Sequence, residues 1–191
     1  MDLTLFVPAV RDLLAEDRLF DLGPGRPVES KRETLAALTP ENLFSPAPDP
    51  AAPPPLRRRD DALACLSGLW LYYDFLDESH NLSQSISTVE GSYWHGILHR
   101  REPDYSNAAY WYRRVGRHPV YAKLGPAAER LAAELSLDIP VPAPWDPYWF
   151  IDFCQECANR SDARTQLARL IKKQEWELLF VHCCGRVKGE G

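Results

Sequence analysis

The proline-rich segment from Ser45 to Pro55 limits the fold more than any other part of the chain. Six of its eleven residues are proline, so it can form neither a helix nor a central strand. We expect an extended, polyproline-like connector here. It would divide the chain into an N-terminal helical arm (1–44), a proline-rich linker (45–56) and a helical core domain (57–191).

Outside this connector, apolar residues recur at helical spacing. No alternating apolar run and no Asn-Gly or Asp-Gly hairpin dipeptide occurs in the sequence. The sequence therefore predicts an all-α fold, a single compact multi-helix domain of about six to eight helices with proline-rich connections. The expected helices span 1–20 (one helix or two short ones), 30–38, 58–81, 91–101, 106–115, 126–135, 146–159 and 162–184.

Some of the expected helix ends carry residues that favour helix termini. Ser30, with Glu33 three residues later, has the pattern of a capping box. Asp104 or Ser106 is a natural N-cap for the helix that follows. Pro126 suits a first helical turn.

The helix expected over 58–81 has a stripe of apolar residues on one face, and polar residues follow them on the same face. Trp70 and Tyr73 recur at helical spacing, and Asp77 and His80 fall on the same face at about 100° per residue. A buried carboxylate or imidazole needs polar partners. Either these two side chains satisfy each other or a backbone group, or they belong to a functional site.

Chemically versatile side chains concentrate between Glu90 and Pro119, which contains three of the five histidines and two Arg-Arg pairs. Residues 91–123 hold six Arg or Lys and two acids, a local charge of +4 (6 − 2), in a chain whose formal net charge is −5. An acidic protein with one basic island suits a small anionic molecule better than a nucleic acid. Alternatively, the arginines pair with the protein's own acids.

His95 and His99 lie four residues apart in an expected helix, so their rings project from one face. Zinc-binding helices use this spacing, but Gly96 replaces the glutamate of the H-E-x-x-H motif. Two imidazoles with a carboxylate such as Glu90 or Glu102 suit zinc, iron or manganese. A divalent metal bound by His95, His99 and Glu90 is one hypothesis. The alternatives are a metal-free acid–base or binding site and a hydrogen-bonded polar core.

Other polar residues then have expected roles around this centre. Glu102, Asp77 and His80 are the expected catalytic residues, as bases or orienting groups. One guanidinium of each Arg pair can face inward and hold an anion bidentately. The expected substrate-binding residues are Arg100, Arg101, Arg113, Asn107 and Tyr110.

The cysteines offer a second metal hypothesis. Cys154 and Cys157, with Cys183 and Cys184, could supply four thiolates, but adjacent cysteines depart from the usual ligand spacing. The odd count of five argues against a disulfide framework. We expect buried cysteines that pack as small hydrophobes, and we expect His182 to be a core histidine with satisfied hydrogen bonds.

The sequence has no apolar run of the roughly 18–20 residues that span a membrane. Its N-terminus also lacks the basic, apolar and small-residue regions of a signal peptide. We therefore expect a cytoplasmic protein without a membrane partner.

The segment WHGILHRREPDYSNAAYWYRRVGRHP, with the preceding LYYDFLDESHNLSQ, resembles a family of bacterial and fungal proteins that carry a W-H-x-I-x-H-R-R-E-x-D-x-x-N-x-x-Y-W-x-R-R-V-G-x-H-P block. The resemblance covers residues 70–120. It implies a shared site without indicating an activity. The site residues it implies are His95, His99, Arg100, Arg101, Glu102, Asp104, Asn107 and Arg113.

These observations favour a small helical enzyme, metal-assisted, that acts on a small anionic substrate through a His, carboxylate and Arg site. One alternative is a non-catalytic module that binds an anion or a partner segment. Another is a polar network that only holds two helices together.

Overall fold

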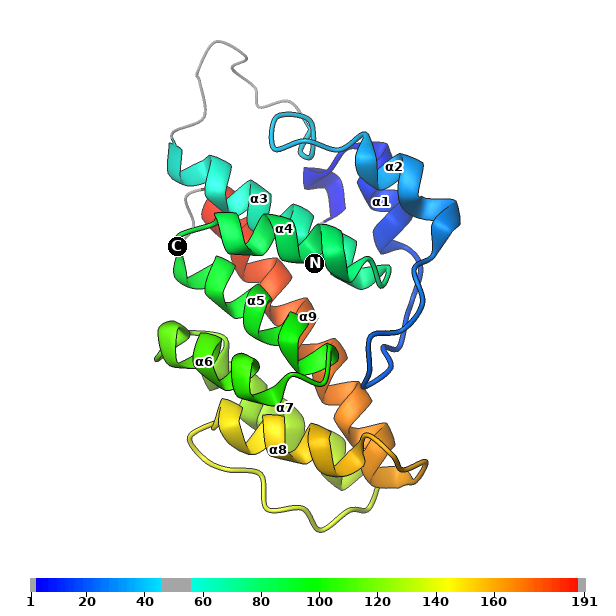
Figure 1. Cartoon of the computed structure of the whole chain (residues 1–191), viewed down its shortest axis with the longest axis vertical. Helices are drawn as coiled ribbons and strands as arrows, with labels where there is room; N and C mark the ends of the chain where they lie inside the picture. The colour runs from blue at the N-terminus through cyan, green and yellow to red at the C-terminus, as the bar shows by residue number, and fades with distance from the viewer. Residues whose placement is uncertain (1–2, 46–55, 189–191) are drawn as a thin grey trace.

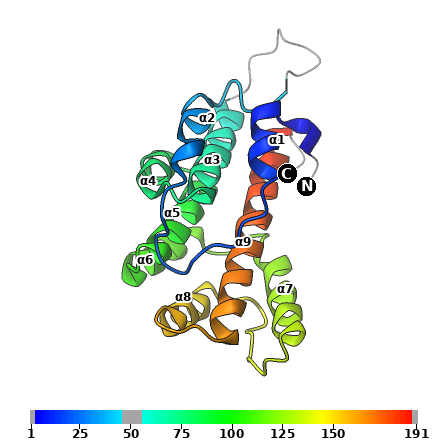
Figure 2. The same ribbon diagram turned by 90° about the vertical axis from the view of Figure 1, so that its right-hand side faces the viewer.

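The longest helix, α9 (Ala163–Lys188), runs through the molecule and contacts helices near both of its ends (Figures 1 and 2). The computed structural model describes residues 3–45 and 56–188. Most of the linker expected over 45–56 therefore lies outside the described residues. Within the described part, nine α-helices and no strands form one compact unit, which confirms the all-α prediction.

Five helices follow one another across the face seen in Figure 1, and each packs against the next. They are α3 (Leu56–Tyr72), α4 (Leu76–Ser85), α5 (Val89–Arg101), α6 (Tyr105–Val115) and α8 (Pro147–Cys157). Helix α7 (Tyr121–Glu134) lies on the other side of α9, as Figure 2 shows. Among the described residues, no helix is both long and apolar enough to cross a membrane.

The N-terminal segment packs against this layer and against α9. It contains α1 (Pro8–Leu14) and α2 (Arg32–Ala36). Phe6, Val10 and Phe20 are buried in the same hydrophobic core as the later helices. Phe6 stacks on Phe180 of α9 with ring centroids 5.8 Å apart, so the first residues complete the core of the helical layer.

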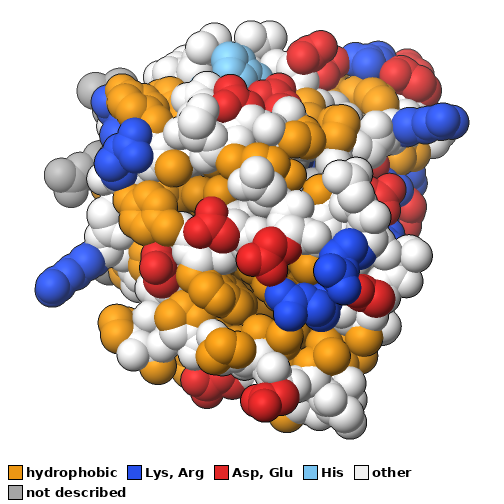
Figure 3. Space-filling model, turned by 60° about the horizontal axis from the view of Figure 1, so that its bottom comes forward, with side chains coloured by type: hydrophobic (Ala, Val, Ile, Leu, Met, Phe, Trp, Pro, Cys, Tyr) orange, Lys and Arg blue, Asp and Glu red, His pale blue; other side chains and the backbone are white. Residues whose placement is uncertain are grey.

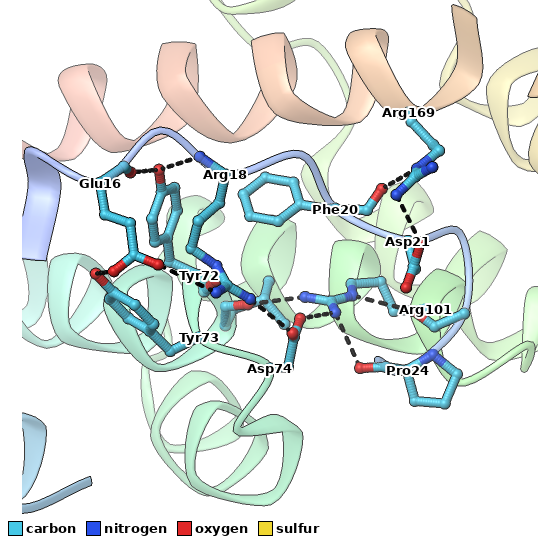
Figure 4. Close-up of polar contacts among 12 residues, drawn as sticks. Glu16, Arg18, Phe20, Asp21, Pro24, Tyr72, Tyr73, Asp74, Arg101 and Arg169 are labelled. Atoms are coloured by element: carbon cyan, nitrogen blue, oxygen red, sulfur yellow. Dashed lines mark hydrogen bonds and ion pairs between the residues drawn. The ribbon is translucent and has the colours of Figure 1, made fainter. Parts of the chain in front are cut away.

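Polar contacts attach this segment to the end of α3 (Figure 4). The Arg18 guanidinium donates to the carbonyl of Tyr72 at 3.1 Å and to the carboxylate of Asp74 at 2.9 Å. The Tyr73 hydroxyl donates to the carbonyl of Leu13 at 2.7 Å. Arg101 of α5 pairs with the same Asp74 carboxylate, so Asp74 links three separate segments.

The continuous helix predicted over 58–81 is wrong, because the chain breaks between α3 and α4. Asp74 adopts a φ of 65°, in the left-handed region that aspartate tolerates better than most residues. The ion pairs of its side chain with Arg18 and Arg101 stabilise this turn. As a result, Asp77 does not continue the face of Tyr73: Tyr73 is buried, whereas Asp77 is exposed in the first turn of α4.

Two predicted helix starts are also wrong. The capping box at Ser30 does not form, because residues 29–31 make a 3-10 turn and Arg32 pairs with Glu29 instead. Pro126 lies inside α7, which begins at Tyr121, so one backbone hydrogen bond of that helix is lost. By contrast, Asp104 is an N-cap as predicted: its carboxylate accepts the Asn107 N–H at 3.2 Å.

All five cysteines are buried and free, which confirms the expectation that they pack as small hydrophobes. The sulfur atoms of Cys65 on α3 and Cys184 on α9 lie 3.4 Å apart. These thiols belong to the contact between α3 and α9.

Candidate metal centre

Three histidines converge where α4 packs on α5. His80 comes from α4, and His95 and His99 come from α5, one helical turn apart. One ring nitrogen of each lies within 4.8 Å of the others. The ring centroids of His80 and His95 are 4.5 Å apart, and those of His95 and His99 are 4.7 Å apart. The predicted pair on α5 therefore gains its third imidazole from the preceding helix.

The three rings differ in their contact with solvent. His95 and His99 are only 1% and 6% exposed, whereas His80 is half-buried. Burial, together with the neighbouring imidazoles, lowers the pKa of His95 to about 3. Burial also lowers the pKa of His99. Both rings are therefore neutral at pH 7, which is the form that ligates metals.

Ser83 orients the ring of His95. Its hydroxyl donates to the carbonyl of His80 at 3.2 Å and lies 3.0 Å from Nδ1 of His95. A hydroxyl has one proton, so this arrangement leaves the oxygen to accept from an Nδ1–H of His95. That tautomer has an unprotonated Nε2, whose lone pair is available to a ligand.

A carboxylate orients the ring of His99 in the same way. Oε2 of Glu102 lies 2.9 Å from Nδ1 of His99, which favours the proton on Nδ1. Nε2 of His99 lies 3.1 Å from Nδ2 of Asn107 and accepts from that amide. The pairing of a ligating histidine with a carboxylate is a common feature of zinc sites.

Beside these rings lies an aromatic side chain, and next to it lies a positively charged one. The Trp111 ring lies over His95 with a centroid distance of 4.0 Å. The guanidinium of Arg114 lies 5.2 Å from the centroid of Trp111. Arg114 is exposed, so it places a positive charge at the solvent edge of the Trp111 ring.

The two arginines that follow His99 are held by the protein itself. Arg100 is 1% exposed and pairs with the buried carboxylate of Glu175 on α9. Arg101 pairs with Asp74 and donates to backbone carbonyls, including that of Leu71 at 2.7 Å. This is the internal pairing that the sequence left open as an alternative to anion binding.

The other expected site residues are divided between the centre and its surroundings. Glu102 and Asn107 contact His99, as described above. Arg113 and Tyr110 are exposed on α6 and contact each other, with the guanidinium 5.8 Å from the ring centroid. The described contacts do not join Arg113, Tyr110 or the exposed Asp77 to the three histidines.

Glu90 belongs to a second cluster with His118 and His182, whose ligand atoms also lie within 4.8 Å of one another. Glu90 accepts from Nε2 of His182 at 3.2 Å and pairs with Arg186 at 3.3 Å. Burial alone would raise the pKa of Glu90, but the hydrogen bond from His182 and the charge of Arg186 help to lower it to about 2. In this structure Glu90 is therefore the partner of His182, not of His95 and His99.

This second cluster suits a metal less well than the first. The backbone N–H of Val120 donates to Nδ1 of His118 at 3.2 Å. Burial lowers the pKa of His118 to about 4, so the ring is neutral and its single proton must lie on Nε2. Neither ring nitrogen then offers a free lone pair, and the backbone N–H of Val120 cannot turn away from Nδ1 as the side-chain amide of Asn107 can turn away from Nε2 of His99. We therefore interpret the cluster as an internal ion-pair network.

Sequence reasoning missed the roles of Ser83 and Glu175 and the pairing of His182 with Glu90. Ser83 had a usable signal, since it lies three residues after His80 on the same helical face. Glu175 had no local signal, because Arg100 is 75 residues away. His182 and Glu90 are separated by 92 residues, which is beyond any spacing rule.

No family model, curated protein or solved structure matches the chain. The resemblance to a bacterial and fungal family over residues 70–120 therefore stays a prediction. The geometry of the three histidines is therefore the best guide to function.

Proposed function

We propose that His80, His95 and His99 bind one divalent transition-metal ion, with zinc the best candidate. Three imidazoles form the protein ligand set of some catalytic zinc sites, and imidazole also suits copper, iron and nickel. The observation that carries this proposal is the convergence of three rings, two of which are held in the ligand-competent tautomer by Ser83 and Glu102. Nε2 of His99 accepts from the amide of Asn107 in this structure, so that side chain would turn away when an ion binds.

The spacing of the nitrogens fits a site that closes slightly around an ion. Zinc–nitrogen bonds of about 2.0–2.1 Å in a tetrahedral site place ligand nitrogens roughly 3.3 Å apart. The three ligand atoms here lie within 4.8 Å of one another. Rotation of the half-buried His80 ring is the least costly adjustment, because no described residue hydrogen-bonds to that ring.

Three histidines leave a fourth ligand position for water. In such sites the metal lowers the pKa of bound water to about 7, so that hydroxide is present at neutral pH. The partial exposure of His80 gives solvent a route to that position. We therefore propose a metal-dependent enzyme that adds water to a small substrate, by hydrolysis or hydration.

The proposal changes the roles of several residues. His80 becomes a ligand in place of Glu90, and Glu102 orients His99. An anionic group of the substrate would pair with Arg114, which lies over Trp111, since Arg100 and Arg101 are held by Glu175 and Asp74.

Metal analysis of the untagged protein tests the proposal directly. We expect close to one equivalent of metal after purification, or after addition of zinc and removal of the excess. With cobalt(II) we expect the intense visible absorption of a four-coordinate site. His80→Ala should abolish both signals with little loss of fold, because the ring is half-buried and has no hydrogen bond from a described residue.

His182→Gln is the matched control, because it changes a histidine of the second cluster and keeps a donor for Glu90. This variant should retain the metal and the cobalt spectrum. A wild-type protein that takes up no zinc or cobalt would overturn the proposal, as would a His80→Ala variant that binds both normally.

A further inference from the structure

A large apolar pocket lies apart from the three histidines, between α7 and the loop that leads into α8. Its volume is about 820 Å³, within the range of small-molecule sites. Rings form most of its wall, including Tyr121, Trp145, Tyr148, Pro126, Pro142 and Pro144. Figure 3 shows the lower end of the molecule, where apolar surface lies between scattered charged side chains.

Three residues of the pocket wall have a buried polar atom without a hydrogen-bond partner among the described residues. These atoms are the hydroxyl of Tyr121, Nε1 of Trp145 and Nε2 of His118. Nearly all buried polar atoms in proteins have a partner in the protein or in ordered water. Trp145 can only donate, and Nε2 of His118 carries a proton, because its Nδ1 accepts from Val120. These three atoms are themselves shielded from solvent, so they lie behind the pocket surface, and the exposed cation of the wall is Arg117.

The pocket is elongated along α7. Tyr121, Gly125 and Glu129 all line it, and a spacing of four residues keeps them on one helical face over about 12 Å. A Cβ on Gly125 would meet no atom nearer than 3.7 Å, on Trp145. The glycine thus leaves space that a larger side chain would fill.

The charges at the two ends of this face differ. The exposed side chain of Arg117 lines the end next to His118 and Tyr121, and the exposed Glu129 lines the other end. A ligand with an anionic group at one end would therefore orient that end toward Arg117.

We infer that this pocket binds an elongated apolar small molecule, aromatic or alicyclic, that carries a carboxylate at the end near Arg117. The rings of the wall contact the apolar body, and the carboxylate pairs with the exposed guanidinium of Arg117. The site is independent of the proposed metal, so binding should be the same in metal-free and metal-loaded protein.

Calorimetric titration with 4-biphenylcarboxylate tests the inference, with 4-biphenylmethanol as the neutral comparison. We expect one site per chain and at least tenfold tighter binding of the carboxylate than of the alcohol. Arg117→Gln should reduce that preference several-fold without changing the circular dichroism spectrum, because Arg117 is exposed.

Ala122→Trp blocks the pocket from an exposed wall position, and Ala133→Trp makes the same change at an exposed position of α7 outside the wall. The first should weaken carboxylate binding at least tenfold, and the second should leave it unchanged. The inference fails if wild-type protein shows no saturable binding at millimolar carboxylate, or if Ala122→Trp binds like wild type. It also fails if crystals soaked in the carboxylate show only ordered water in the pocket beside Arg117.

Discussion

The hydroxyl of Ser83 lies 3.0 Å from Nδ1 of His95 and 3.2 Å from the carbonyl oxygen of His80, so one side chain connects two of the three converging histidines. Because the hydroxyl donates to that carbonyl, it accepts from His95 and sets the tautomer of the ring. Ser83→Ala removes this constraint. We expect the affinity for zinc to fall by about 10–100-fold, measured by competition with a chromophoric chelator.

The same variant should remain folded, since the two hydrogen bonds that are lost cost about 1 kcal/mol each. Ser92→Ala is a suitable control, because Ser92 is also buried but donates to the carbonyl of Thr88. Equal zinc affinities for the two variants would contradict a positioning role for Ser83.

The ion pair between Arg100 and Glu175 gives a second prediction, for stability. Glu175 is 0% exposed, and Oε1 accepts from the Tyr112 hydroxyl at 2.9 Å. Glu175→Gln leaves the buried guanidinium of Arg100 without its counter-charge. We expect the free energy of unfolding to fall by about 3–5 kcal/mol, measured by urea denaturation.

Replacing both partners separates a structural pair from an anion-binding arginine. An Arg100→Met, Glu175→Met variant removes both charges of this pair, so the loss should be smaller than in Glu175→Gln. A double variant that is less stable than the single one would contradict this account. Zinc binding should persist in the double variant, because neither residue contacts the three histidines in the structure.

The sequence predicted those parts of the fold that depend on neighbouring residues. The N-cap at Asp104 and the i, i+4 pair of His95 and His99 are local features, and the structure contains both. The break at Asp74 could not be predicted, because the carboxylate is held by Arg18, which is 56 residues away. The residues next to Asp74 in sequence form no pattern that predicts its left-handed backbone.

The candidate site was predictable only in part for the same reason. The sequence placed His80 near the other histidines, but it also placed Asp77 on the same buried face, which requires a helix that the structure does not have. Glu90 was grouped with His95 by proximity in sequence, whereas its partner His182 comes from α9. Such pairings depend on which helices pack together, and a single sequence does not show that packing.

Gly91 supports a third prediction, about the approach of α4 to α5. A Cβ at this position would lie 2.5 Å from the carbonyl oxygen of Ile86 and 2.6 Å from its Cβ. Backbone cannot move aside as a flexible side chain can, so Gly91→Ala should destabilise the protein by about 1–3 kcal/mol. Because the same contact sets the turn between His80 and His95, zinc affinity should fall as well.

Gly185→Ala is the matched control on α9, where no atom of the described residues outside the helix's own backbone lies within 4 Å of the added Cβ. This change should stabilise the helix by up to about 1 kcal/mol. Similar melting temperatures for the two variants would show that the contact at Ile86 relaxes without cost.

The titration of His118 gives the last prediction, on the pH dependence of stability. Burial, with the nearby His182 and Arg186 opposed by Glu90, lowers the pKa of His118 to about 4, below the ordinary value of 6.5. As the pH falls below 6.5, the unfolded chain takes up this proton first, so stability is lost until the pH reaches about 4. Between pH 7.5 and 5 the loss from this residue is on the order of 2 kcal/mol.

Urea denaturation of chelator-treated protein at both pH values measures this loss without a contribution from bound metal. His118→Asn is the informative variant, because its amide oxygen can still accept the Val120 N–H, while the side chain does not titrate. We expect the variant to lose less stability than wild type on acidification, by roughly the amount that His118 contributes. Equal losses would mean that His118 is protonated in the folded protein, and the assignment of its proton to Nε2 alone would then be wrong.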